Sequence, residues 1–118
     1  MGAIALPPAS GAASCISVSP GTAATTTSTT QMPAGAVVID CRVNVTTPYS
    51  AGATIEVGIA GTLADFMGTA DNDPQLDGLY SVPQQTTVAG ASAVVVTIGA
   101  GPVAGVCVVL VFYVIPVT

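Results

Sequence analysis

The sequence of 118 residues contains almost no positive charge, because Arg42 is its one basic residue and it has neither lysine nor histidine. Six acidic residues bring the net charge to −5. Proteins that hold nucleic acid neutralise several phosphates with Lys or Arg, and proteins that bind a membrane surface carry a polybasic patch. One arginine can do neither, so the sequence predicts no nucleic-acid partner and no membrane partner.

The lack of histidine and lysine also removes the usual general bases, so nothing in the sequence would activate a Cys or Ser nucleophile at neutral pH. Only carboxylates remain, and there is no tryptophan to form a sugar platform. Neither an aspartic-protease motif nor a glycine-rich phosphate loop is present. We therefore expect no enzyme, no catalytic residue and no cofactor.

Charged residues of either sign are scarce: they make up 6% of the chain, whereas apolar residues make up 51%. The length suits one domain. Its surface must be built largely from Thr, Ser, Gly, Ala and Gln, which do little to keep copies apart. This composition favours a protein that is packed in an assembly, and the alternative is a monomer kept soluble by hydroxyl groups.

The three cysteines, Cys15, Cys41 and Cys107, are widely spaced and form no CxxC pair, which argues against a zinc site. Two of them lie in apolar alternating runs, where a free thiol acts as a small buried hydrophobe. Three reduced cysteines are the expectation. The alternative, one disulfide in a secreted protein, has no support from the N-terminal residues, which lack the positive region of a secretory signal.

Acidic residues gather in "DNDPQLDG", residues 71–78, which suggests a cation site because hard cations bind several oxygen ligands. The spacing does not fit a helix-loop-helix calcium site, since Leu76 occupies the position of the required glycine. The same residues are strong turn formers. A surface turn held by Asx hydrogen bonds is therefore expected, and no metal ligand is assigned.

A long uncharged stretch, "VVVTIGAGPVAGVCVVLVFYVIP", covers residues 94–116 and is long enough for a membrane helix. Its Val and Ile content favours strands, and no Lys, Arg or Trp marks either end. Pro102 and the glycines around it divide the stretch. We expect two strands, at 92–99 and 105–115, that form a hairpin with a loop of about five residues.

Alternating apolar residues predict further strands at 36–46 and 54–60. In the first, Ile39, Cys41, Val43 and Val45 should share the inner face. If the two strands pair, Glu56 or Asp40 can neutralise Arg42 across the exposed face. Downstream, Thr62 and Asp65 suit the start of one short helical turn, and short strands are expected at 79–83 and 85–90.

The first 31 residues contain no charge and are rich in small residues, which cannot bury enough area to fold alone. We divide the chain into residues 1–31 and a domain at 32–118. Residues 1 to about 13 are predicted to be an extended arm, and 14–31 to add one or two edge strands. A glycosylated stalk is the alternative for "TAATTTSTT".

Together these patterns predict an all-β protein, a single β-sandwich with an extended N-terminal arm and with jelly-roll connectivity as one option. The run "MPAGAVVIDCRVNVTTPYSAGATIEVGIAGTLADFM", residues 32–67, resembles small β-sandwich virion proteins of tailed bacteriophages. It shares with them a Pro-Ala-Gly start, an alternating valine strand ending in Thr-Thr, and a Val-Gly strand. The "DNDPQLDGLY" segment fits the same pattern, and the resemblance covers residues 32–118.

This resemblance implies a structural virion protein and transfers no active-site residue. The function expected from it is a capsid decoration (cement) protein on the outer surface of the phage head. Its partner would be the major capsid protein or another virion protein. Two alternatives stay open: a neck, tail-fibre or receptor-binding module, and a secreted pilin-like or adhesin-like subunit. A disulfide between Cys41 and Cys107 would favour the latter.

Neither face of the strand at 105–115 is polar, so both faces need a cover. We expect a central strand whose inner face packs on Ile39, Val43, Ile55 and Val57, and whose outer face lies in a homotrimer contact. The sequence leaves open which alternate set points inward. The predicted partner-binding residues are Ile4 and Leu6 in the arm, with Val108, Leu110 and Phe112 on the strand.

Overall fold

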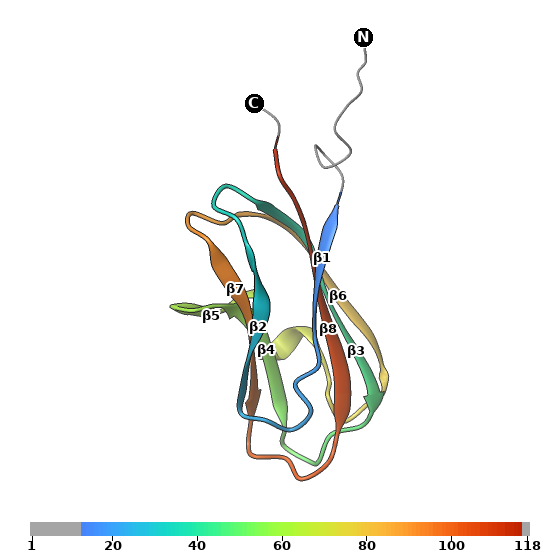
Figure 1. Ribbon diagram of the computed structural model, residues 1–118. Helices are drawn as coiled ribbons and strands as arrows, with labels where there is room; N and C mark the ends of the chain where they lie inside the picture. The colour runs from blue at the N-terminus through green and yellow to red at the C-terminus, as the bar shows by residue number, and fades with distance from the viewer. Residues whose placement is uncertain (1–12, 117–118) are drawn as a thin grey trace.

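The computed structural model describes residues 13–116 as two antiparallel β-sheets packed face to face (Figure 1). The predicted all-β sandwich is confirmed. Its elements are β1 (Ser14–Val18), β2 (Thr25–Met32), β3 (Val37–Thr47), β4 (Thr54–Ile59), β5 (Thr62–Met67), the 3₁₀ turn η1 (Thr69–Asp71), β6 (Gly78–Thr87), β7 (Ser92–Gly99) and β8 (Val106–Val114).

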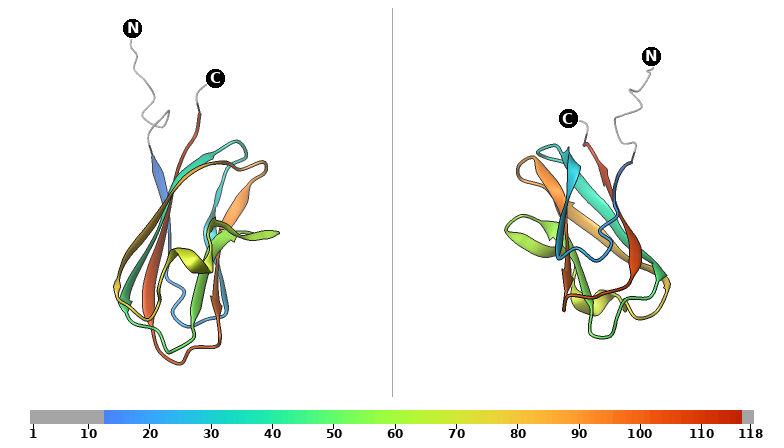
Figure 2. Two further views of the ribbon diagram at one scale, coloured as in Figure 1. Left: turned by 180° about the vertical axis from the view of Figure 1, so that it is seen from behind. Right: turned by 60° about the horizontal axis from the view of Figure 1, so that its bottom comes forward.

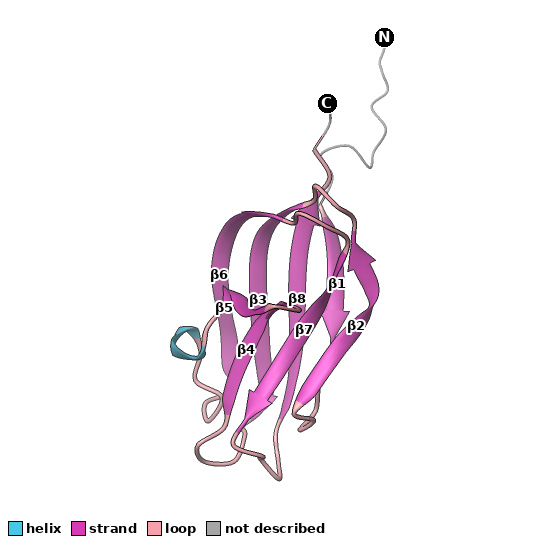
Figure 3. Ribbon diagram, turned by 90° about the vertical axis from the view of Figure 1, so that its left-hand side faces the viewer, coloured by secondary structure: helices cyan, strands magenta, loops and turns pink. Residues whose placement is uncertain are grey.

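One sheet has the strand order β1-β8-β3-β6 and the other β2-β7-β4-β5, as Figure 3 shows from the side. The pairs β1–β8, β2–β7, β3–β6 and β4–β5 are therefore those of one long antiparallel ribbon rolled so that successive pairs alternate between the sheets. This connectivity is jelly-roll-like. It places the central strand β8 between β1 and β3.

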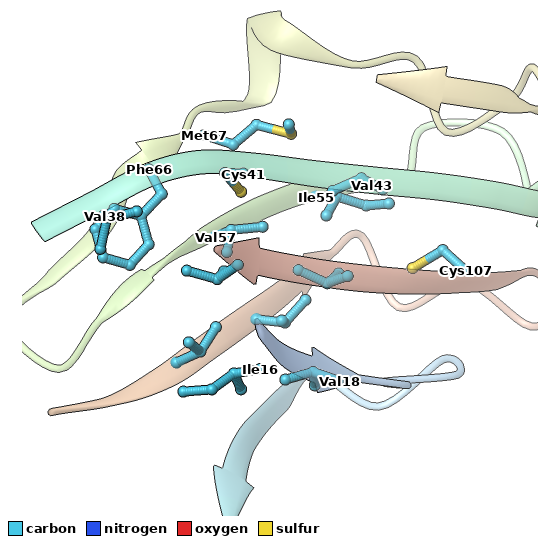
Figure 4. Packing of buried hydrophobic residues seen from close by; sticks show 14 of the residues in the cluster. Ile16, Val18, Val38, Cys41, Val43, Ile55, Val57, Phe66, Met67 and Cys107 are labelled. Atoms are coloured by element: carbon cyan, nitrogen blue, oxygen red, sulfur yellow. The ribbon is translucent and has the colours of Figure 1, made fainter. Parts of the chain in front are cut away.

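The core lies between the sheets, and its most frequent residue is valine, one of the β-branched types that pack well on a pleated surface. Figure 4 shows Cys41 and Val43 of β3 facing Ile55 and Val57 of β4. Phe66 and Met67, the last two residues of β5, close the core and are fully buried. Alternate residues point inward in β8 and in β3 from Cys41 onward, so there the burial follows the period of two expected for a strand.

The inner face of β3 differs from the prediction at one position. Val38 is completely buried, whereas Ile39 is half-buried and lies outside the core. The register of β3 against both neighbours shifts between Val38 and Asp40, which marks a β-bulge. A bulge adds one residue to the strand and reverses the alternation beyond it. The prediction that the inner face of β8 packs on Ile39 is therefore wrong.

The region after β4 was also predicted incorrectly. Residues 62–67 form strand β5 instead of a helical turn, and the helical turn follows at Thr69–Asp71. The β4–β5 hairpin bends out of its sheet, as both views in Figure 2 show. Gly58 permits the bend, because a Cβ atom there would overlap the backbone of Thr62 and Leu63.

Residues 78–87 form one strand, β6, where two short strands were expected. Pro83 lies within it, at a place where β6 pairs only with β3. Proline has no N–H to donate and is tolerated on a strand at the edge of a sheet. Pro83 is therefore compatible with one continuous strand.

The uncharged stretch at 94–116 forms β7 and β8, close to the predicted bounds, but these strands do not form a hairpin. β7 pairs with β2 and β4, and β8 pairs with β1 and β3 in the other sheet. The connecting loop crosses from one sheet to the other. Among residues 13–116 no helix is long and apolar enough to cross a membrane.

The N-terminal third contributes an edge strand to each sheet, since β1 is an outer strand of one and β2 of the other. β2 continues to Met32, so this strand crosses the predicted boundary between residues 1–31 and 32–118. Met32 is fully buried. Ile4 and Leu6 lie outside the described residues. The division into an arm and a sandwich domain therefore stays a prediction.

Candidate interaction surface

The two faces of β8 are now distinguished by burial. Cys107, Val109, Val111 and Tyr113 point inward and are buried. Val108, Leu110, Phe112 and Val114 point outward and are half-buried, and Val106, at the start of the strand, points outward and is exposed. We call the outward set the β8 stripe. Val43 lies beside the inner set on β3, and Ile55 and Val57 belong to the same core cluster.

Polar residues border the β8 stripe on both sides. On β1, Cys15 pairs with Phe112 and Ser17 with Leu110. On the other side three polar residues of β3 pair with Phe112, Leu110 and Val108, respectively: Asp40, Arg42 and Asn44. On the outward face of this sheet the apolar strip of β8 therefore lies between the rows of β1 and β3, and β6 adds the exposed Leu79 beyond the β3 row.

Arg42, the one basic residue, is held at the edge of the stripe. Its Nε lies 2.8 Å from Asp40 Oδ2, and its guanidinium carbon lies 5.1 Å from the centre of the Phe112 ring. Asp40 Oδ1 also accepts a hydrogen bond from Ser81 Oγ at 3.1 Å. Of the two expected partners, Asp40 is correct and Glu56 is not, because β3 and β4 belong to different sheets.

This ion pair is partly exposed to solvent, which limits its contribution to stability to about 1 kcal/mol. The Arg42 guanidinium is already paired with the Asp40 carboxylate and lies over the Phe112 ring. The stripe can thus bind by apolar contact, with one charge pair at its border. Residues 13–116 contain no pocket and no group of three potential metal ligands.

The acidic segment at 71–78 forms turns, as expected from its composition. Asp71 Oδ2 accepts a hydrogen bond from the Gly68 N–H at 2.9 Å, and Asp73 Oδ1 accepts one from the Gln75 N–H at 3.2 Å. These bonds satisfy backbone groups within the loop.

The cysteines lie too far apart for the disulfide that would favour a secreted subunit. Cys41 pairs with Val111, whereas Cys107 pairs with Val45, on the same two neighbouring strands. The two cysteines are thus four strand positions apart, about 13 Å at 3.3 Å per residue, and a disulfide needs Cα atoms within about 7 Å. Cys41 and Cys107 are buried free thiols, and Cys15 is an exposed one.

Burial, with smaller contributions from Asp40 and Asp71, raises the pKa of Cys41 from its ordinary value of 9.0 to about 12. Between these values the unfolded chain loses the proton while the folded chain keeps it, so we expect stability to fall as the pH rises from 9 towards 12. One such group contributes at most about 1.4 kcal/mol per pH unit. Urea unfolding at a series of pH values measures this slope.

The comparison variant is Cys41→Ala, which should be less stable than the parent below about pH 9 but should show a shallower decline above it. Tyr49 and Cys107, whose pKa values burial also raises, keep part of the slope in both proteins. If the free energy of unfolding fell with pH equally steeply in the two proteins, the decline could not be attributed to Cys41.

Sequence analysis missed one buried side chain that joins the loops at the end of the sandwich. Tyr49 follows β3 in the connection between the strands predicted at 36–46 and 54–60, yet it is buried. Its hydroxyl donates to the Gly21 carbonyl at 2.6 Å and lies 3.3 Å from Cys107 Sγ. An isolated tyrosine beside Pro and Gly gives no signal for such a role, which depends on loops distant in sequence.

Known proteins were compared with this chain by sequence and by structure. No protein-family model matches the chain, and a search of curated proteins gave no match. One similar solved structure is a chain of the acidic stable capsid of Helicobacter pylori bacteriophage KHP30, with a TM-score of 0.71, 17% identity and 89% coverage of each chain. Another is a chain of the cyanophage Pam1 capsid asymmetric unit, with a TM-score of 0.66 and 20% identity over 98% of this chain and 93% of that one. The chain shares its β-sandwich fold with these two chains of bacteriophage capsid structures.

Proposed function

We propose that this chain is a structural virion protein, specifically a capsid decoration (cement) protein that binds and stabilises the outer face of a phage head. The observation that carries the proposal is that two chains of bacteriophage capsid structures share the fold over about nine-tenths of its length. The acidic composition agrees with a position away from the packaged nucleic acid.

The β8 stripe supports an assembled state. Five apolar side chains point outward from one strand, and covering a large apolar side chain fully is worth about 1.5 to 3 kcal/mol. Polar rows on β1 and β3 give this strip the form of an apolar interface centre with a polar rim. A second copy of the chain, in a homotrimer, is the partner that we propose for the stripe.

Particle binding tests the proposed function. The full chain is added to heads of the virus that encodes it, assembled without this protein, and bound and free chain are separated by sedimentation. We expect saturable binding and a higher temperature of head disruption. Absence of binding, or binding without any change in head stability, would contradict the cement function.

Cys15 provides a separate test of the oligomeric contact. This exposed thiol pairs with Phe112 and so reports whether the outward face is covered. The partial burial of Cys15 raises its pKa, so labelling is best performed at mildly alkaline pH. We expect a thiol reagent to label it faster when dilution dissociates the oligomer, and a rate independent of concentration would argue against a contact over the stripe.

The arm gives a further prediction. Deleting residues 1–13 should leave the sandwich folded, because β1 begins at Ser14, but should weaken binding to heads. Ile4 and Leu6 are the proposed anchors, so replacing both with Ser should reproduce the effect in a full-length chain. Thermal unfolding and particle sedimentation are measured for each variant. Undiminished incorporation of the deleted chain would refute the role of the arm.

A further inference from the structure

Five large apolar side chains are strongly exposed among the described residues, and four of them gather at one end of the sandwich. Val103 is 92% exposed in the β7–β8 loop, and Leu76 is 60% exposed before β6. Leu79, the second residue of β6, is 59% exposed, and Val106, the first residue of β8 and the end of the β8 stripe, is 48% exposed. We call these four residues the loop end. The fifth, Leu63, lies on β5.

The register places the loop end opposite the end at which the described chain begins and finishes. Ser14 pairs with Tyr113, and Val37 with Val114, at one end of the sheet. Leu79 and Val106 pair with Asn44 and Thr47, near the other end of β3. Figures 1 and 2 show the β3–β4 and β7–β8 loops together at this second end.

Hydrogen bonds fix the loops that carry these side chains. Ser50 Oγ accepts from the N–H groups of Val103 and Ala104, both at 3.1 Å. Gln75 Nε2 donates to the carbonyl oxygens of Ser50 and Ala53 at 3.0 and 3.2 Å. The β7–β8 loop and the loop before β6 are thereby both hydrogen-bonded to residues 50–53. The backbone that carries the apolar side chains is therefore already ordered, and binding needs little further loss of conformational entropy.

The charges around the loop end are all of one sign. Asp73 and Asp77 flank Leu76 and are exposed. The only basic residue of the chain, Arg42, is bound to Asp40 on the outward face of the sheet. A symmetric contact between two loop ends would bring acidic residues of both copies together without a compensating base, which is unfavourable. A different protein with basic residues complements this surface.

We propose that the loop end is a docking surface for a partner protein whose own surface is apolar and bordered by Lys or Arg. This inference rests on the proposed function and makes it more specific: the site on the phage head has that chemistry and meets the end of the sandwich remote from the point where residues 1–12 join it. The arm and the loop end would then bind different neighbours.

The test compares serine substitutions in the full-length chain. Leu76→Ser and Val103→Ser should each weaken binding to heads on the order of 10-fold, because each removes exposed apolar surface that binding covers. Leu63→Ser is the matched control, since it removes an exposed leucine far from the loop end, and should leave binding unchanged. All three variants should keep the thermal stability and oligomeric state of the parent.

A charge test runs in parallel. Asp73→Asn combined with Asp77→Asn should weaken binding at low salt and reduce its dependence on ionic strength. Equal binding by the parent and by Leu76→Ser and Val103→Ser would overturn the proposal, as would an equal loss in Leu63→Ser or a change of oligomeric state. If the parent chain itself does not bind heads, the proposed function fails before the loop end is tested.

Discussion

Val109→Asp is expected to prevent folding, whereas Val108→Asp, one residue away on β8, should fold but lose the oligomeric contact. Val109 is completely buried between the sheets, with no basic group nearby to pair with a carboxylate. Burying that charge costs at least about 4 kcal/mol, a large part of the 5 to 15 kcal/mol that stabilises a typical domain. Circular dichroism and urea unfolding measure the loss.

Val108 points outward beside Asn44, so an aspartate there remains hydrated, and the free chain should lose only about 1 kcal/mol. Analytical ultracentrifugation should show a folded monomer. If Val108→Asp stays oligomeric, the β8 stripe is not the contact. If Val109→Asp folds with normal stability, the assignment of the inner face is wrong.

Gly105→Ala should destabilise the protein by about 3 kcal/mol. Gly105 has a φ of 140°, which residues with a side chain rarely adopt, and an added Cβ atom would overlap the buried ring of Tyr49. Backbone strain and overpacking each cost roughly 1 to 3 kcal/mol. The Tyr49 hydrogen bond to Gly21 would be displaced with the ring. Thermal unfolding measures the effect.

The matched control is Gly90→Ala. Gly90 does not have a positive φ, and an added Cβ atom there would have no neighbour within 4 Å. Replacing it should cause no loss and can stabilise the chain by up to about 1 kcal/mol, by restricting the unfolded state. Equal effects of the two substitutions would show that Tyr49 does not depend on the space at Gly105.

Most strands could be predicted because their signal is local. At 37–47 and 54–59 a period of two records which residues point inward and which outward. At 92–99 and 106–114 the Val and Ile content, with glycine and proline between the two runs, indicates strands without showing which face is inner. The one error of element type lies where that signal is weak, because the apolar residues at 62–67 fit either a turn of helix or a strand. The strands expected at 79–83 and 85–90 form the single strand β6, which is an error of bounds, and Pro83 is tolerated there because an edge strand does not need its N–H.

The functional surface was predictable in part. The absence of a polar face at 105–115 showed that both faces of this strand must be covered by other residues. The composition showed that the chain lacks the basic side chains needed to bind nucleic acid. The residues of the loop end gave no such signal. Leu76, Leu79, Val103 and Val106 come from two parts of the chain about 25 residues apart, and each is an ordinary apolar residue in its own segment.

The sequence by itself determined the all-β class, most strand positions, the burial of Cys41 and Cys107 and the lack of positive charge, because each follows from residue type and local periodicity. Only the tertiary structure decided which face of β8 points inward, that β7 and β8 belong to different sheets, and that Val38 replaces Ile39 in the core. These features depend on strand pairing, on one bulge and on contacts between distant loops. Alternation in one strand is the same whichever sheet the strand joins, so the sequence pattern does not contain them.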